Sequence, residues 1–252
     1  MSQLNKVKST SFSRTSDYEK CPLFFKYRHI DKIKDPAPPL PEGVEYPMER
    51  GTRIHKLAED YVQNSMLRLP EELAHHERGF AALRKAYEQE MVTLEMPLAF
   101  DKNWRLSAGD DFENTTYRMV ADVAVQPTPD RLLIIDHKTG KKQGNEVKHH
   151  RQLMEYAVCF NIVAPQIQIF DMQIWYLDLP EGENVMAKTF TRSQVVNAFT
   201  PMRERHNKVL EATIFPAHPS QFACRFCPYK SGMVGRGKRA YPGTGHCRKN
   251  VV

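Results

Sequence analysis

Two aspartates and a lysine form the clearest chemical pattern in the sequence. Asp136 follows the apolar run 132–135, and Lys138 comes two positions later. Because side chains alternate along a strand, Asp136 and Lys138 are expected to point to the same side where a buried strand ends. Asp122 stands alone in the alternating segment 120–124, where a buried carboxylate is costly unless it is paired or binds a cation. The pattern predicts two carboxylates and an ammonium group on neighbouring strands.

This combination suits the hydrolysis of phosphodiester bonds. Carboxylates bind Mg²⁺ or Mn²⁺ through oxygen, and the bound ions activate water and offset the charge of the phosphate. A lysine can orient the water or stabilise the negative charge that develops. The same residues also fit a simpler interpretation, in which Asp136 and Lys138 form a surface ion pair and Asp122 is a satisfied buried acid. The pattern by itself leaves both interpretations open.

Two predicted helices carry polar pairs spaced four residues apart, so that each pair shares one helix face. His55 and Glu59 lie on the first helix, where a neutral imidazole could ligate a metal and Glu59 could orient it. Gln152 and Tyr156 lie on the helix 148–163, with their polar tips expected over the end of the acidic strand. The alternatives are a structural histidine and an ordinary amphipathic helix.

The predicted elements define an α/β fold. Hydrophobic periodicity and cap residues predict helices at 51–67, 71–92, 148–163 and 193–213, and strands at 94–100, 104–107, 116–125, 132–136, 169–177 and 186–191. A short helix capped by Thr15, or by Ser16 and Asp17, is expected before Tyr27, and the proline-rich segment 35–47 is expected to be a loop. This order predicts a central mixed β-sheet flanked by helices.

Charge and hydropathy narrow the class of protein. The net charge is +6, and residues 224–252 contain seven Lys or Arg and no acid. If this tail meets the basic first 35 residues, the two make a face suited to a phosphate backbone; the alternative is a solvated tail. No apolar run reaches the roughly 18 residues of a membrane helix, and no apolar stretch follows the N-terminus as in a signal peptide. We therefore expect a cytoplasmic protein without a membrane span.

Five cysteines in such a compartment are expected to bind metal or to be buried rather than to form disulfides. Cys224 and Cys227 form a C-x-x-C turn, Cys247 follows after nineteen residues, and Cys21 lies near the N-terminus. Four thiolates can hold an iron–sulfur cluster or a zinc ion, and the spacing does not choose between them. Cys159, which lies among apolar residues of a predicted helix, is expected to be a buried small side chain.

Taken in order, the motifs resemble those of the PD-(D/E)XK nuclease superfamily, in particular its RecB-like exonuclease branch with CRISPR-associated and phage iron–sulfur relatives. The matching segments span nearly the whole chain: residues 11–22, Arg50-Gly-Thr-Arg-Ile-His55, Ala121-Asp122, Ile135-Asp-His-Lys-Thr139, Gln152-x-x-x-Tyr156 and the cysteine-bearing tail. The resemblance implies a restriction-endonuclease-like core within one domain spanning 1–252. Residues 1–35 and 214–252 would then form a subregion that holds a metal cluster.

The resemblance also implies a role for each matching residue. Asp122 and Asp136 would bind the metal, with His55 as a further ligand and His137 contributing its backbone carbonyl. Lys138 would be the catalytic lysine. Gln152 and Tyr156 would contact the DNA end or support the site. Glu95, on the preceding strand, is left outside this core assignment as a structural or supporting acid.

For the cysteines, the resemblance implies a 4Fe-4S cluster on Cys21, Cys224, Cys227 and Cys247 that joins the two ends of the nuclease domain. This sequence departs from the relatives in the long gap before Cys247. The departure puts Cys247 in question, and the neighbouring His246 keeps zinc as the alternative.

The expected function is that of a Mg²⁺- or Mn²⁺-dependent deoxyribonuclease, with exonuclease action on DNA ends or single strands in recombination, repair or phage DNA metabolism. The cell would be prokaryotic or a phage-infected host, and a recombinase, helicase or integrase is the kind of protein partner expected. The alternatives are a catalytically idle DNA-binding adaptor subunit and an RNA-directed nuclease on the same fold.

Overall fold

The chain divides into two compact units. The computed structural model describes residues 7–38, 40, 43–107, 114–235 and 240–249. Unit 1 comprises residues 1–43, 115–117 and 203–252, and unit 2 comprises residues 44–114 and 118–202. Both segments expected to form the cysteine-bearing subregion fall in unit 1, although their outer ends at 1–6 and 250–252 and the basic stretch 236–239 lie outside the described residues. The expectation of a single domain stays a prediction.

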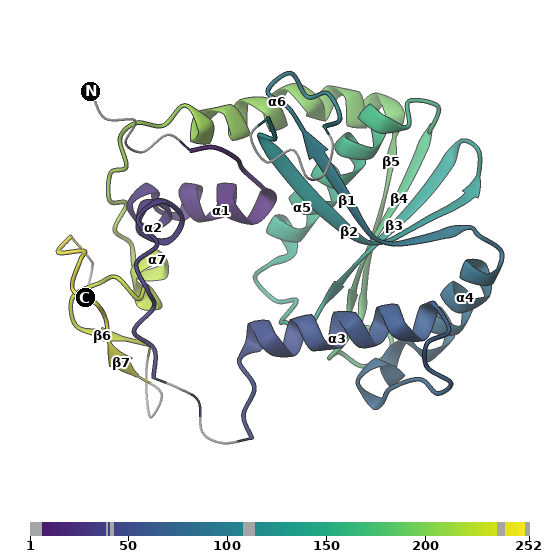
Figure 1. Cartoon of the computed structure of the whole chain (residues 1–252), viewed down its shortest axis with the longest axis horizontal. Helices are drawn as coiled ribbons and strands as arrows, with labels where there is room; N and C mark the ends of the chain where they lie inside the picture. The colour runs from purple at the N-terminus through teal and green to yellow at the C-terminus, as the bar shows by residue number, and fades with distance from the viewer. Residues whose placement is uncertain (1–6, 39, 41–42, 108–113, 236–239, 250–252) are drawn as a thin grey trace. The chain divides into compact units, whose positions relative to one another are not determined.

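Unit 2 is built on a five-stranded mixed sheet in the order β1-β2-β3-β4-β5 (Figure 1). The strands are β1 Val92–Phe100, β2 Tyr117–Thr128, β3 Arg131–Lys138, β4 Ile169–Tyr176 and β5 Val185–Thr191. Strand β3 pairs antiparallel with β2 and parallel with β4, and β4 pairs antiparallel with β5. The predicted α/β fold with a central mixed sheet flanked by helices is therefore confirmed.

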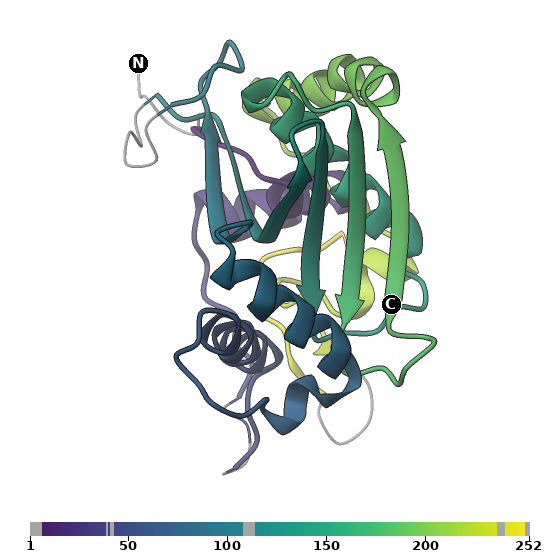
Figure 2. The same ribbon diagram turned by 90° about the vertical axis from the view of Figure 1, so that its right-hand side faces the viewer.

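Helices cover the sheet and supply the core of unit 2. Helix α3 (Pro47–Val62), the 3-10 turn η2 (Glu71–His76) and α4 (Glu77–Glu88) lie on one face, as Figure 2 shows. Ile54 of α3 and Phe80 of α4 are fully buried in one cluster with Ile135 of β3. Each such side chain stabilises the fold by about 1.5–3 kcal/mol. The parallel crossover from β3 to β4 runs through α5 (Glu146–Val163), and α6 (Arg192–Leu210) begins in unit 2 after β5.

Several local predictions differ from the structure. The helix predicted at 51–67 begins at Pro47, at the end of the segment expected to be a loop, and ends at Val62. The predicted strand 104–107 is reduced to an isolated bridge between Phe100 and Leu106, because Trp104 has a φ of 60° and interrupts the extended chain. The predicted helix 71–92 starts as the 3-10 turn and ends at Glu88, shortly before Glu90, which has a φ of 59°. The helix before Tyr27 is capped by Ser11, whose Oγ accepts a hydrogen bond from the Arg14 amide at 3.3 Å.

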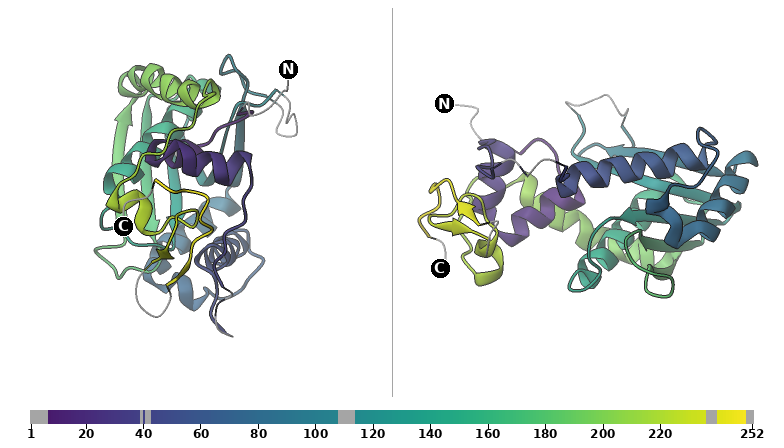
Figure 3. Two further views of the ribbon diagram at one scale, coloured as in Figure 1. Left: turned by 90° about the vertical axis from the view of Figure 1, so that its left-hand side faces the viewer. Right: turned by 90° about the horizontal axis from the view of Figure 1, so that it is seen from below.

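Unit 1 is assembled from the two ends of the chain. It contains α1 (Phe12–Lys20), α2 (Pro22–Phe25), the π-helical turn η1 (Lys26–Ile30), α7 (Gln221–Arg225), and the short strands β6 (Met233–Val234) and β7 (Tyr241–Pro242) (Figure 3). Val7 and Phe25 from the N-terminal part pack with Val209 and Phe215 in one apolar cluster. None of the helices in the described part of the chain is long and apolar enough to cross a membrane.

Candidate active site

Helix α3 is held close to the end of β3 by residues of the Arg50–His55 motif. A Cβ atom at Gly51 would lie 3.3 Å from Thr139 Oγ1, tighter than an ordinary van der Waals contact, so a glycine suits this close approach. The Arg50 guanidinium donates two hydrogen bonds to the Asp178 carboxylate, at 2.9 and 2.6 Å. These contacts place His55, one turn after Gly51, over the strands that carry the acids.

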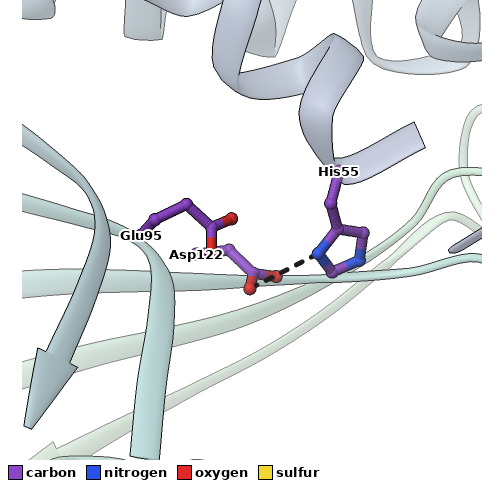
Figure 4. A group of neighbouring side chains, drawn as sticks. All are labelled: His55, Glu95 and Asp122. Carbon is purple, nitrogen blue, oxygen red and sulfur yellow. Dashed lines mark ion pairs between the residues drawn. The ribbon is translucent and has the colours of Figure 1, made fainter. Parts of the chain in front are cut away.

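His55, Glu95 and Asp122 form one compact group of potential metal ligands (Figure 4). Their ligand atoms all lie within 4.8 Å of one another, and they come from α3, β1 and β2 respectively. His55 Nδ1 lies 3.5 Å from Asp122 Oδ1, and the His137 amide donates a hydrogen bond of 2.6 Å to Asp122 Oδ2. Glu95 has a φ of 45°, an unusual backbone conformation for a residue in a strand.

The electrostatics of this group favour a cation between the carboxylates. Burial tends to raise the pKa of Asp122, but His55 and the neighbouring cationic groups outweigh burial, and the pKa is lowered. Burial tends to lower the pKa of His55, but Asp122 outweighs it, and that pKa is raised. Burial, followed by the charge of Asp122, raises the pKa of Glu95. The His55 imidazole and the Asp122 carboxylate therefore each favour the charged form of the other.

Asp136 is 2 % exposed and is surrounded by polar side chains. Its Oδ1 accepts hydrogen bonds from Gln152 Nε2 at 3.0 Å and from the Tyr156 hydroxyl at 3.1 Å. Gln152 Nε2 also donates to the Tyr156 oxygen at 2.8 Å, so the two α5 residues form a linked pair. Lys138 Nζ lies 2.5 Å from Asp136 Oδ2 as an ion pair, and that buried oxygen has no other polar partner in the described part of the chain.

Burial is also the largest influence on the pKa values of Asp136, Lys138 and Tyr156. It raises the pKa of Asp136; Lys138 opposes that shift, and the charge of Asp122 adds to it. Burial tends to lower the pKa of Lys138, but the Asp136 carboxylate outweighs it and raises the pKa. Burial raises the pKa of Tyr156 well above its usual value, so its hydroxyl remains a hydrogen-bond donor to Asp136. Burial thus opposes the charge of Asp136, whereas the Asp136 carboxylate supports the charge of Lys138.

The side chains present fit a divalent cation. An imidazole nitrogen and two carboxylates converge at His55, Glu95 and Asp122, and Asp136 adds a buried oxygen. Mg²⁺ favours oxygen ligands, and Mn²⁺ also accepts imidazole nitrogen. The donor set is therefore one that these two ions accept.

The structure brings together the six side chains that the sequence predicts for the site: His55, Asp122, Asp136, Lys138, Gln152 and Tyr156. The ring of His137 is buried beside Phe80 and Trp175, and burial lowers its pKa to about 4. The metal contact expected of the His137 carbonyl stays a prediction. Glu59, expected to orient His55, instead pairs with Lys56 at 2.9 Å.

Glu95 is the member of the site that the sequence assignment left out. It lies on β1, which neighbours β2 in the sheet, and its carboxylate meets that of Asp122. An acid within a strand adjacent to the strand of Asp122 is the signal that could have identified it. The order of strands in the sheet, which decides that adjacency, is not readable from local patterns.

The four cysteines at 21, 224, 227 and 247 line one small hollow of about 20 Å³ within unit 1. Cys224 and Cys227 are buried, and burial raises the pKa of the Cys227 thiol. Among the described residues, no three of these sulfur atoms lie as close together as the ligand atoms of His55, Glu95 and Asp122 do. Cys159 is fully buried in α5, as expected for a small apolar side chain.

A comparison with protein families agrees with this fold. Residues 9–231 match the model of the PD-(D/E)XK nuclease superfamily. The chain therefore belongs to the PD-(D/E)XK nuclease superfamily, whose members use divalent metals such as Mg²⁺ or Mn²⁺. No curated protein sequence matches the chain.

Solved structures with a similar fold are distant in sequence. The crystal structure of SSO0001 is 11% identical with a TM-score of 0.42, and the match covers 90% of this chain and 86% of that one. An alkaline exonuclease from Laribacter hongkongensis is 11% identical with a TM-score of 0.38, over 82% of this chain and 89% of that one. The same exonuclease in complex with dAMP is 14% identical with a TM-score of 0.37, over 81% and 88%.

Proposed function

We propose that the protein is a Mg²⁺- or Mn²⁺-dependent deoxyribonuclease that acts as an exonuclease on DNA in recombination, repair or phage DNA metabolism. The observation that carries the proposal is the convergence of His55, Glu95 and Asp122 beside the buried Asp136–Lys138 pair, in a chain of this nuclease superfamily. An idle adaptor subunit has no need of such a site, because burying these charged groups costs stability.

His55, Glu95, Asp122 and Asp136 are the residues that would hold the metal. A divalent ion bound there supplies activation of water and neutralisation of the phosphate charge. Asp136 keeps its orientation because Gln152 and Tyr156 both donate to Oδ1, which leaves Oδ2 beside the Lys138 ammonium. The Asp122 carboxylate is similarly oriented by the His137 amide. The acids are thus positioned before any substrate arrives.

Lys138 is the cation of the chain that stands beside these acids. Its Nζ is already paired with Asp136 at 2.5 Å, so it stays charged despite burial. We assign it two roles: it orients the attacking water through a hydrogen bond, and it stabilises the additional negative charge on the phosphate as the P–O bond breaks. A preorganised donor of this kind contributes about 10²–10³-fold to a rate.

The test of the reaction class is digestion of end-labelled DNA. Linear and circular DNA, each single- and double-stranded, and a matched RNA are incubated with Mg²⁺ or Mn²⁺, with and without EDTA. We expect shortening of linear DNA from an end, intact circles, and no reaction in EDTA. Cut circles would replace the exonuclease by an endonuclease, and preferential RNA cleavage would favour the RNA-directed alternative. Absence of metal-dependent cleavage on every substrate would support the adaptor alternative.

We also propose that Cys21, Cys224, Cys227 and Cys247 bind one metal centre, a 4Fe-4S cluster with zinc as the alternative. The support is that these four residues, from both ends of the chain, line the same hollow. Anaerobically purified protein is then brown, with broad visible absorbance that is lost in Cys224→Ala and retained in the matched variant Cys159→Ala. A colourless protein with stoichiometric zinc would identify the alternative, and a protein without metal would refute the proposal.

A further inference from the structure

The turn that carries Cys224 and Cys227 has two chemically opposite sides. Ala223, Cys224 and Cys227 are buried, whereas Phe222 is 92% exposed and Phe226 is 58% exposed. The two phenylalanines are four residues apart across the short helix α7, so their side chains are neighbours on its outer surface. The fold that turns the cysteines inward therefore presents two aromatic rings to the solvent.

Two exposed phenylalanines on the same surface are typical of a binding site, because a ligand that covers them removes apolar area from water. Burying a phenylalanine is worth about 1.5–3 kcal/mol relative to leaving it in water, so a pair of rings offers substantial binding energy. The Arg225 guanidinium lies over the Phe226 ring, 5.0 Å from its centroid. A ligand that covers this ring also meets a positive charge.

Unit 1, which carries the aromatic pair, has a strongly basic composition. Counted from the sequence, unit 1 holds eighteen Lys and Arg against seven Asp and Glu, a net charge of +11. Several of its acids are already paired: Asp17 with His29, Glu19 with Arg205, and Asp31 with Lys26. Lys230 and Lys249 line the same hollow as Ala223 and Cys224, on the inner side of the turn.

We propose that Phe222 and Phe226 form a stacking platform for the bases of single-stranded nucleic acid, with Arg225, which already lies over the Phe226 ring, contacting its backbone. Flat aromatic faces next to basic side chains are the elements with which proteins hold single strands without reading their sequence. A protein partner is the competing ligand, because protein interfaces are also enriched in phenylalanine and arginine. The net charge of +11 in unit 1 favours a polyanion instead. The inference rests on the proposed function only in taking a nucleic acid as the ligand.

The experiment measures binding of a fluorescein-labelled dT20 to the full-length protein by anisotropy, in EDTA so that no cleavage occurs. Loss of one base–aromatic stack is expected to raise Kd at least about fivefold. We therefore expect Phe222→Ala with Phe226→Ala to raise Kd at least about 25-fold, while Phe222→Trp with Phe226→Trp keeps it within about twofold. The matched control is Ile214→Ala, which removes an apolar side chain of unit 1 that is 77% exposed.

Two outcomes overturn the inference. Unchanged dT20 binding by the double alanine variant means that the rings take another ligand, and monomerisation of a dimeric protein by that variant would identify a second copy of the chain as that ligand. An equal loss of binding in Ile214→Ala means that general apolar contact, not stacking, is responsible. Because the readout is binding in EDTA, it is independent of the nuclease proposal, which is tested by cleavage alone.

Discussion

The two units contain the same number of basic residues and differ in their acids. Each holds eighteen Lys and Arg, but unit 1 has seven Asp and Glu where unit 2 has twenty-three, so their net charges are +11 and −5. In unit 2 Asp122 lies beside His55, and the buried Asp136 lies beside Lys138. In unit 1 the basic residues accompany exposed aromatic rings and a cysteine-lined hollow. The difference fits the division of labour that we propose, in which unit 2 hydrolyses the phosphodiester and unit 1 holds the nucleic acid.

The largest effect is expected from removing an acid of unit 2, which should abolish cleavage without changing DNA binding. Asp122→Asn keeps the shape of the side chain but removes the charge that attracts both His55 and a cation. We expect cleavage to fall at least about 10³-fold and Mn²⁺ binding, measured by calorimetry, to weaken strongly, while dT20 binding is unchanged. The matched control is Asp171→Asn, which breaks a surface pair with Arg131 and should leave cleavage intact. Loss of dT20 binding in Asp122→Asn would show that the two functions are not divided.

Removing one of the hydrogen bonds that orient Asp136 should reduce cleavage less than Asp122→Asn does. Tyr156→Phe removes the donor that lies 3.1 Å from Asp136 Oδ1 and leaves Gln152 as the remaining side-chain donor to that oxygen. Loss of such a supporting group typically costs about 10–100-fold in metal affinity or activity. The cleavage rate is measured as a function of Mn²⁺ concentration, with Tyr61→Phe on α3 as the control. A full rate at every metal concentration would show that Tyr156 has no positioning role.

A pH dependence of stability is expected from unit 2. Burial, followed by the positive charges of Lys138 and Lys148, lowers the pKa of His149 from 6.5 to about 4. The unfolded chain therefore takes up a proton below about pH 6.5 while the folded protein does not. Stability is then lost as the pH falls from about 6.5 to about 4, by at most about 3 kcal/mol.

The variant His149→Gln isolates this contribution. Glutamine cannot titrate and can still hydrogen-bond to the Tyr176 hydroxyl, which lies 2.7 Å from His149 Nδ1. Urea unfolding between pH 7.5 and 4.5 should show the variant gaining stability relative to the wild type as the pH falls. If the stability of the two proteins changes with pH to the same extent, then His149 has the same pKa in the folded and unfolded states.

The smallest expected effect concerns a single basic residue of unit 1. Arg225→Ala and Arg225→Gln should each weaken dT20 binding a few-fold and lower the slope of log Kd against log salt by about 0.7, the value for one phosphate contact on a single strand. The salt series is measured in EDTA. The control is Lys85→Ala, on α4 of unit 2. A slope that does not change in either variant would place the phosphate contacts elsewhere.

Local patterns in the sequence were sufficient for most of the elements and for part of the site. The apolar run before Asp136 and the alternation around Asp122 identify β3 and β2, because burial of a strand leaves a periodic trace. The Gln152–Tyr156 pair was predictable because i, i+4 residues share a helix face. Glu95 could not be assigned in this way, since its role depends on which strand pairs with β2. Trp104 ended a predicted strand through a backbone conformation that its residue type does not signal.

The exposed rings of unit 1 illustrate the same limit. The sequence Cys224-Arg-Phe-Cys227 indicates a metal-binding turn, yet nothing in it says which side chains turn outward. Only the packing of Cys227 with Phe24 and Tyr229, from distant parts of the chain, fixes the inner side and so exposes Phe226. Contacts between residues far apart in sequence therefore decide two features: that Glu95 joins His55 and Asp122, and that Phe226 faces the solvent.

The most direct test of the division of labour is a parallel measurement on Lys138→Met. Single-turnover cleavage of 5′-labelled single-stranded DNA in Mn²⁺ and dT20 binding in EDTA are determined for the variant and the wild type. The account predicts a rate reduced by about 10²–10³-fold, with Kd unchanged within about twofold because the charge removed lies in unit 2. A variant that cuts at the wild-type rate would contradict the assignment of the site around Asp122, Asp136 and Lys138.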